Sequence, residues 1–305
     1  MASLKNIKLK ILSYKKTGTV THAMEAVSAV KMRKSQERAL GGRAYAAAGL
    51  SVLERLSGTA DLKRHPLMRE GSGKLCAVIV TSDKGLAGSL NSGVIRKLEE
   101  YLRERDLGPK DVIIIAFGRR GGDHFINRGY DVRIKKENIS DDITESDVRS
   151  ATDTLIGWHS AGEIGGCVVV YQNFISTFEQ MPTVRQIVPV TAGMMKEMVA
   201  GIRPARGRYA PTTGEDIAAP AAYTIEPDAD TVLAVLLPRL LNVAIFHSIL
   251  ESKASEHSAR MVAMKSATDK AKEMAHDLTR KFNKVRQAAI TREVSEITSG
   301  MEAMK

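Results

Sequence analysis

Residues 239–299 read RLLNVAIFHSILESKASEHSARMVAMKSATDKAKEMAHDLTRKFNKVRQAAITREVSEITS, a run that contains neither glycine nor proline. The strongest helix breakers are therefore missing over about sixty residues, which as one helix would measure roughly 90 Å. Ordinary globular helices average about 11–12 residues. A helix this long cannot fold back into a compact enzyme core, so we expect a mechanical element that reaches toward a partner.

The same run carries a stripe of small and apolar residues at alternating steps of three and four. This is the period of a coiled-coil seam. Only His257 and Thr268 on the stripe are polar, and we expect His257 to set the register rather than to bind a metal. The stripe consists of Leu250, Ala254, His257, Met261, Met264, Thr268, Ala271, Ala275, Leu278, Phe282, Val285 and Ala289.

The start of the chain also has helical spacing of apolar residues, from Leu4 to about Ser57, although Gly18, Gly41 and Gly42 weaken it. Because the two helical segments flank everything else, they can wind together as an antiparallel pair. The alternative is two separate surface helices packed on the middle of the chain. It fits less well, because a sheet of about five strands is only some 25 Å across.

The middle of the chain alternates β-branched apolar runs with helical patterns, as in a small doubly wound α/β domain. The expected strands are 75–81, 112–117 and 168–171, and the expected helices are 89–104, 122–128 and 145–163. Residues 183–190 and 222–225 are candidate edge strands, and 201–220 is a loop rich in glycine and proline. Asp228 or Asp230 can cap the last helix, in which Pro238 predicts a kink or a boundary.

The predicted fold class is therefore α/β, with a long antiparallel coiled coil of the N- and C-terminal helices and an inserted Rossmann-like α/β domain. We expect the N-terminal coiled-coil helix at residues 1–58 and the Rossmann-like domain at 74–226. The C-terminal coiled-coil helix then occupies residues 228–305.

The charge balance points to an acidic partner. The net charge is +10 and the isoelectric point about 9.5, which suits nucleic acid, anionic lipid or an acidic protein. Residues 1–45 contain ten basic side chains but only two acidic ones, Glu25 and Glu37. These bases alternate with apolar positions and no nucleic-acid-binding motif is present. A basic coiled-coil protein that binds nucleic acid remains the alternative hypothesis.

Cysteine usage and hydropathy bound the compartment. Cys76 and Cys167 each lie in an apolar run, so we expect buried free thiols and a reducing compartment. We find no stretch of about twenty apolar residues and therefore expect no membrane-spanning helix. The N-terminus lacks the apolar core of a signal peptide and reads as mature helix.

The middle of the chain carries only weak signals of a catalytic or ligand-binding site. The turn at residues 82–91 lies where a doubly wound fold would bind phosphate, but it lacks a Walker pattern and a full G-x-G-x-x-G. Residues 118–122 (GRRGG) fit a basic turn at a strand exit. The seven histidines show no metal-ligand spacing. We therefore predict no catalytic site, cofactor or metal of the chain's own.

Sequence blocks near the start, middle and end of the chain resemble one family, in family order. They are THAMEAVSAVKMRKSQ at 21–36, SDKGLAGSLN at 82–91, SEHSARMVAM at 255–264 and NKVRQAAITRE at 283–293. The chain is similar in these blocks to the γ subunits of F-type ATP synthases. It departs from the family's usual residues at Ala26, Ala87, Ser89, Asp269, Arg292 and Ser299–Met301.

The resemblance implies a non-catalytic rotor shaft. The paired terminal helices would sit inside a ring of three α and three β subunits, and the α/β domain would bind the ε subunit and the membrane c-ring. Proton flow would turn the shaft and drive ATP synthesis or hydrolysis at the β subunits. The chain would then be a peripheral membrane protein on the cytoplasmic face of the bacterial inner membrane.

The resemblance also implies which side chains contact partners. Those expected to contact and couple to the β subunits are Met24, Lys31, Arg260, Arg286, Gln287, Thr291 and Glu293. Arginine suits bidentate pairing with the acidic residues of a partner loop. The turn at 82–91 is expected to face a partner through Asp83, Lys84 and Ala87.

Overall fold

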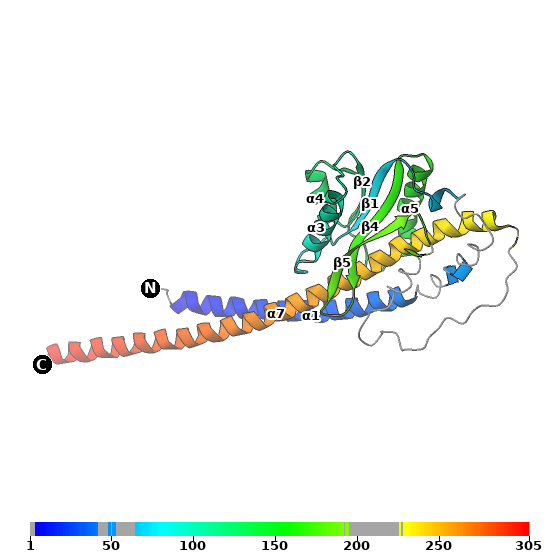
Figure 1. The fold of residues 1–305 in the computed structure, drawn as a ribbon. Helices are drawn as coiled ribbons and strands as arrows, with labels where there is room; N and C mark the ends of the chain where they lie inside the picture. The colour runs from blue at the N-terminus through cyan, green and yellow to red at the C-terminus, as the bar shows by residue number, and fades with distance from the viewer. Residues whose placement is uncertain are drawn as a thin grey trace. The chain divides into compact units, whose positions relative to one another are not determined.

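The computed structural model (Figure 1) describes residues 4–41, 48–49, 51–52, 65–191, 193–194, 226 and 228–304. Its elements are α1 (Leu4–Gly41), η2 (Pro66–Met68), β1 (Lys74–Val80), α3 (Leu90–Arg103), β2 (Val112–Phe117), α4 (Arg119–Asn127), β3 (Asp131–Lys136), α5 (Glu145–Ser160), β4 (Ile164–Phe174), β5 (Gln180–Val188) and α7 (Ala229–Ala303). The candidate strand at 222–225 and the loop at 201–220 lie outside the described residues.

The chain divides into two compact units. The first, called the shaft unit below, consists of Met1–Ser28 and Met261–Lys305. The second, called the sheet unit, consists of Ala29–Arg260.

Helix α1 and helix α7 form an antiparallel seam within the shaft unit. The hydroxyl oxygens of Thr21 and Thr268 lie 2.6 Å apart in a hydrogen bond. A Cβ placed on Gly18 would lie 3.6 Å from the Cβ of Ala271. As residue numbers rise along α1, those of the residues opposite in α7 therefore fall. In α7 the predicted stripe holds buried or half-buried residues throughout, from Met261 to Ala289, so the heptad prediction is confirmed.

The sheet unit contains a five-stranded sheet in the order β3-β2-β1-β4-β5. Strands β1 to β4 pair in parallel and β5 runs antiparallel to β4 at the edge. This confirms the three predicted strands and the edge strand at 183–190. Strand β3 was not predicted.

Helices cover both faces of the sheet, with α3 and α4 on one side and α5 on the other (Figure 1). In β1, Cys76 and Val78 face a core shared with α5 and residues 233–250 of α7. Ala77 and Ile79 face a second core shared with α3 and α4. This period of two explains the uninterrupted apolar runs in the sequence. Both cysteines are free and buried, as predicted, and they are register partners in β1 and β4.

Helix α7 begins at an aspartate cap and passes through a proline. The carboxylate of Asp228 accepts the Thr231 N–H at 2.8 Å, which is the bond of an N-cap. Pro238 lies inside the helix, so of the two alternatives the boundary is wrong, and the kink stays a prediction. Leu237 and Leu240 on either side are fully buried, and this burial holds the helix together across the missing N–H. The N-terminal helix ends at Gly41 in the described chain, and most of residues 42–58 lies outside it.

Helix α7 also contains an 18-residue window that is long and apolar enough to cross a membrane by composition. The expectation that no such stretch exists is therefore wrong. Of that window, 61% is buried inside the fold, where residues such as Leu241 and Ile245 pack against the sheet. The same composition thus serves as the core face of a helix.

Candidate functional site

The turn at residues 82–91 is held by its own side chains. Asn91, at the start of α3, accepts the Ser82 N–H at 2.9 Å and donates to the Ser82 hydroxyl at 2.8 Å. The same hydroxyl lies 2.6 Å from the carbonyl oxygen of Lys84. These bonds close the position where a doubly wound fold usually admits phosphate.

Asp83 ties this turn to two neighbouring segments. Its carboxylate accepts the N–H of Arg119 at 2.9 Å and the N–H of Ile139 at 3.3 Å. Arg119 is the first residue of α4, so a carboxylate already occupies the favourable anion position at this helix N-terminus. Gly118 lies at the strand exit, as predicted, but residues 119–122 form the first turn of α4, where Asp83 accepts the N–H of Arg119.

The predicted partner-facing residues of the turn differ in exposure. Ala87 is buried at 2% exposure and Asp83 is half-buried, whereas Lys84 is exposed. Leu86 is 62% exposed and has a φ of 65°. Lys84 and Leu86 are therefore exposed in this turn, and its contact with a partner stays a prediction. Leu86 was not predicted, although an apolar residue in a polar turn was a visible signal.

Arg260 reaches this turn from α7. Its guanidinium donates to the Glu256 carboxylate at 2.6 Å and to the carbonyl oxygen of Gly85 at 3.4 Å. The residue is only 9% exposed. Arg260 thus makes its polar contacts inside the sheet unit, and its assignment to a β-subunit contact stays a prediction.

Lys31 also has a partner within the sheet unit. Its ammonium group lies 2.7 Å from Asp141, in the segment between β3 and α5. Met24 belongs to the other unit, where it lies half-buried on α1. Lys31 and Arg260 therefore both have polar partners inside the sheet unit, and the assignment of all three residues to a β-subunit contact stays a prediction.

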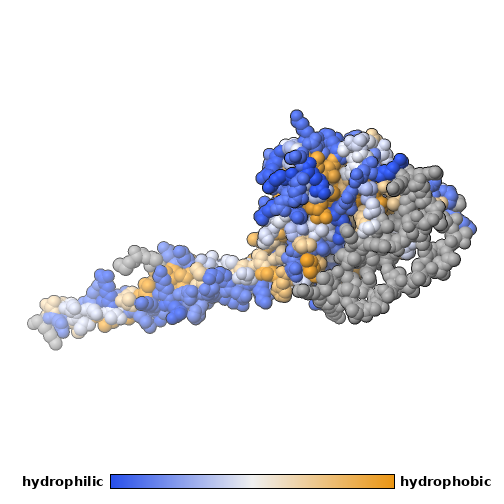
Figure 2. All heavy atoms as spheres, viewed as in Figure 1, coloured by the Kyte–Doolittle hydropathy of each residue, from blue (hydrophilic) through white to orange (hydrophobic). Residues whose placement is uncertain are grey.

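The four candidates near the end of α7 are all exposed. Thr291 donates to the Gln287 carbonyl oxygen at 3.0 Å, a bond within the helix. Arg286 and Glu293 lie seven residues apart and so share one helix face. Beyond Ala289, every residue that the structure describes is exposed, including Ile290, Val294, Ile297 and Met301. In Figure 2, hydrophobic residues are interspersed with hydrophilic ones along this unit.

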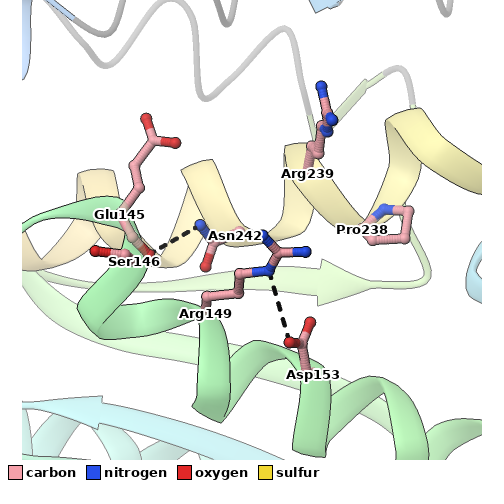
Figure 3. A pocket seen from close by; sticks show the side chains of 7 residues that line it. All are labelled: Glu145, Ser146, Arg149, Asp153, Pro238, Arg239 and Asn242. Atoms are coloured by element: carbon pink, nitrogen blue, oxygen red, sulfur yellow. Dashed lines mark hydrogen bonds and ion pairs between the residues drawn. The ribbon is translucent and has the colours of Figure 1, made fainter.

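A pocket of about 390 Å³ lies between α5 and α7 in the sheet unit (Figure 3). In it, the Asn242 side chain donates to the Glu145 carbonyl oxygen at 3.2 Å, and Arg149 pairs with Asp153 at 3.7 Å. Two contacts thus join the residues that line it. The pocket is lined by Glu145, Ser146, Arg149, Asp153, Pro238, Arg239 and Asn242.

A buried polar cluster lies where α7 crosses β4. His247 Nδ1 and Glu251 Oε1 are 3.4 Å apart, and both residues are at most 4% exposed. Burial raises the pKa of Glu251 to about 7, against the lowering effects of Arg185 and of the Tyr171 hydroxyl. Burial, with Arg185, lowers the pKa of His247 to about 3.

This cluster predicts a pH-dependent stability. The folded-state pKa of Glu251 lies above its ordinary 4.5, so its contribution to stability is largest at low pH and is lost as pH rises to about 7. His247 acts oppositely and stabilises the fold as pH rises from about 3 to 6.5. We expect the free energy of unfolding of Glu251→Gln, relative to that of wild type, to increase by about 2 kcal/mol as the pH rises from 5 to 8.

Urea unfolding of the purified chain at several pH values measures this difference. The variant Glu104→Gln, at an exposed position, is the control and should follow the wild-type curve. Parallel wild-type and Glu251→Gln curves would contradict the prediction.

A family model described as ATP synthase matches residues 3–304. Chains named ATP synthase gamma chain are 36% identical in Pelotomaculum thermopropionicum and 37% identical in Geotalea daltonii, each with 100% of both chains covered. The relative from Chloroflexus aurantiacus is 36% identical over 100% of this chain and 99% of its own.

Solved structures share the fold. A chain from the Euglena gracilis mitochondrial ATP synthase structure (OSCP/F1/c-ring, rotational state 3) matches with a TM-score of 0.62 and 17% identity, over 99% of this chain and 94% of that one. A chain from the rotor of the same enzyme gives a TM-score of 0.59 at 15% identity, over 94% and 99%. Full-length agreement of family model and relatives leaves no support for the nucleic-acid-binding alternative. The chain belongs to the ATP synthase gamma chain family.

Proposed function

We propose that the exposed end of α7, with Arg286, Gln287, Thr291 and Glu293, is where this gamma subunit contacts the β subunits. As a gamma subunit the chain is the central stalk of the rotor in ATP synthase, a membrane-associated complex. Catalysis then belongs to other subunits, and this chain has no catalytic site of its own. The bonds that close the turn at 82–91 support that assignment.

One observation carries the proposal. From Met261 to Ala289 the stripe residues of α7 are buried or half-buried, but from Ile290 onward the described helix is exposed on every side. Five large apolar residues are among those exposed, at 51–84%. A helix with uncovered apolar residues needs a partner surface. The motif at 283–293 lies at this transition, so its polar side chains can engage a surrounding subunit.

The further partners follow from the solved relatives. Those structures are titled as F1/c-ring and rotor assemblies, and we extend this arrangement to α, β, ε and the c-ring around the present chain. The bacterial relatives support the cytoplasmic face of a bacterial inner membrane. We also propose the three-part division into residues 1–58, 74–226 and 228–305.

The double variant Arg286→Ala, Gln287→Ala tests the contact. It removes one charge and one amide from an exposed face, so the chain should fold and assemble normally. We expect coupled ATP hydrolysis and synthesis in the reconstituted complex to fall roughly tenfold, with nucleotide binding to β unchanged.

The matched control is Lys284→Ala, which removes one charge from a nearby exposed position. It should couple like wild type. A double variant that also couples like wild type would refute the assignment of Arg286 and Gln287, while leaving the family membership untouched.

A further inference from the structure

The segment between β3 and α5 meets both long helices of the sheet unit at one carboxylate. Asp141 lies 2.7 Å from the Lys31 ammonium of α1 and 2.8 Å from His257 Nε2 of α7. A second α7 cation, Lys253, lies 3.8 Å away. We call Asp141, Lys31, Lys253 and His257 the Asp141 cluster.

Side chains of the same two helices also donate hydrogen bonds to backbone carbonyl oxygens around this cluster. Arg38 of α1 donates to the carbonyl oxygen of Asp141 at 2.6 Å and also to that of Ile143. Lys253 of α7 donates to the carbonyl oxygen of Ile139 at 2.7 Å. The Ile139 N–H in turn reaches Asp83. The segment is therefore bonded to α1, to α7 and to the turn after β1.

On each helix the donors lie on one face, toward the segment between β3 and α5. Lys31 and Arg38 are seven residues apart on α1, and Lys253 and His257 are four apart on α7, so each pair shares one face. Ile143 is 5% exposed and belongs to the core beneath the sheet. The segment thus joins the core of the sheet to both helices.

The charges on Asp141 favour a persistent contact. Burial would raise the pKa of Asp141, but hydrogen bonds from Lys31 and His257 hold it well below its usual range. The carboxylate therefore stays ionised at neutral pH. Its side chain is 25% exposed, against 68% for the neighbouring Asp142, which pairs with Lys34 at 2.7 Å. Exposed pairs such as the second contribute little to stability.

We propose that Asp141 is a positioning residue for rotary coupling. Through this carboxylate the sheet holds α1 and α7 of the sheet unit at a fixed angle, so that torque passes between the sheet and the two helices. The inference rests on the gamma-subunit role and concerns only the sheet unit. A rotor subunit must resist twisting between the part that is driven and the helices that act on the catalytic subunits. A carboxylate bonded to both helices at once resists rotation of either helix against the sheet.

The test compares Asp141→Asn with Asp142→Asn in the reconstituted full complex. Each removes one carboxylate charge with little change of shape. We expect Asp141→Asn to lower the number of protons pumped per ATP hydrolysed against an opposing proton gradient by roughly threefold, with Asp142→Asn at the wild-type ratio. Asp141→Glu should restore part of the loss.

Assembly yield and thermal stability are measured on the same complexes. A lower stability with an unchanged proton-to-ATP ratio in assembled Asp141→Asn complexes would overturn the proposal, because Asp141 would then be purely structural. An equal loss in both variants would also overturn it. The wild-type complex, measured in parallel, reports the gamma-subunit function itself.

A double-mutant cycle separates this role from a contact of Lys31 with the β subunit. In the cluster, the losses of coupling from Lys31→Ala and Asp141→Asn should be strongly non-additive. Additive losses would count against the cluster and favour an independent partner contact of Lys31.

Discussion

Gly118→Ala is expected to abolish stable folding of the sheet unit, with a loss of at least about 4 kcal/mol in free energy of unfolding. Gly118 joins β2 to α4 at a φ of 98°. A Cβ there would lie 2.0 Å from the Thr81 carbonyl oxygen and 2.6 Å from the Thr81 carbonyl carbon. Both are backbone atoms that directly follow the buried strand β1. Neither can move aside without breaking the sheet.

Gly88→Ala is the matched control, since it lies at the same edge of the sheet with a φ of 58°. No atom lies within 4 Å of a Cβ at that position. Its cost is only conformational and should be about 1 kcal/mol. Circular dichroism and urea unfolding of both variants measure the difference. Equal stabilities would show that the close approach of Gly118 to Thr81 is not what limits substitution.

The sheet was predictable where the strands are buried on both faces. Strands β1, β2 and β4 are continuous apolar runs, and in a chain that alternates strands with helices such runs are typical of a covered parallel sheet. Strand β3 reads DVRIKK, with Val132 and Ile134 between charged residues. At this edge of the sheet both residues are only partly buried, Val132 against the core shared with α3 and α4 and Ile134 against the core shared with α5, so the run is short and mixed. Its pattern therefore did not predict a strand.

The heptad stripe was predictable for the same reason, because it depends only on local spacing. The Asp141 cluster was not. Lys31 and Asp141 are 110 positions apart in sequence, and the segment 139–143 carries no motif from which its contacts with α1 and α7 could be predicted. Likewise, nothing in SEHSARMVAM indicates that Arg260 bonds to the carbonyl oxygen of Gly85. Contacts of this kind depend on how the helices and strands pack together, and this packing cannot be predicted from local sequence patterns.

The seam of the shaft unit leads to the second large expected effect. Ala271 packs opposite Gly18 on α1, with 3.6 Å between the Ala271 Cβ and a Cβ placed on Gly18. Next along the seam, Thr21 and Thr268 are bonded at 2.6 Å. At this closest approach the two helices leave no space for a large side chain, although a groove of about 610 Å³ opens beside it, lined by Gly18 and Ala275 among others. Ala271 is only 5% exposed, so we expect the ring of Ala271→Phe to push α1 and α7 apart and to break the threonine bond.

We expect Ala271→Phe to destabilise the shaft unit by about 3 kcal/mol, the upper range for overpacking a seam, and to lower coupled ATP synthesis in the reconstituted complex roughly tenfold. The control Asp269→Phe adds the same ring at an exposed position two residues away, where it does not enter the seam. If the helices act as one stiff element, only Ala271→Phe uncouples the complex. If both variants synthesise ATP at the wild-type rate, close packing of the two helices is not required for coupling, and α7 alone carries the load.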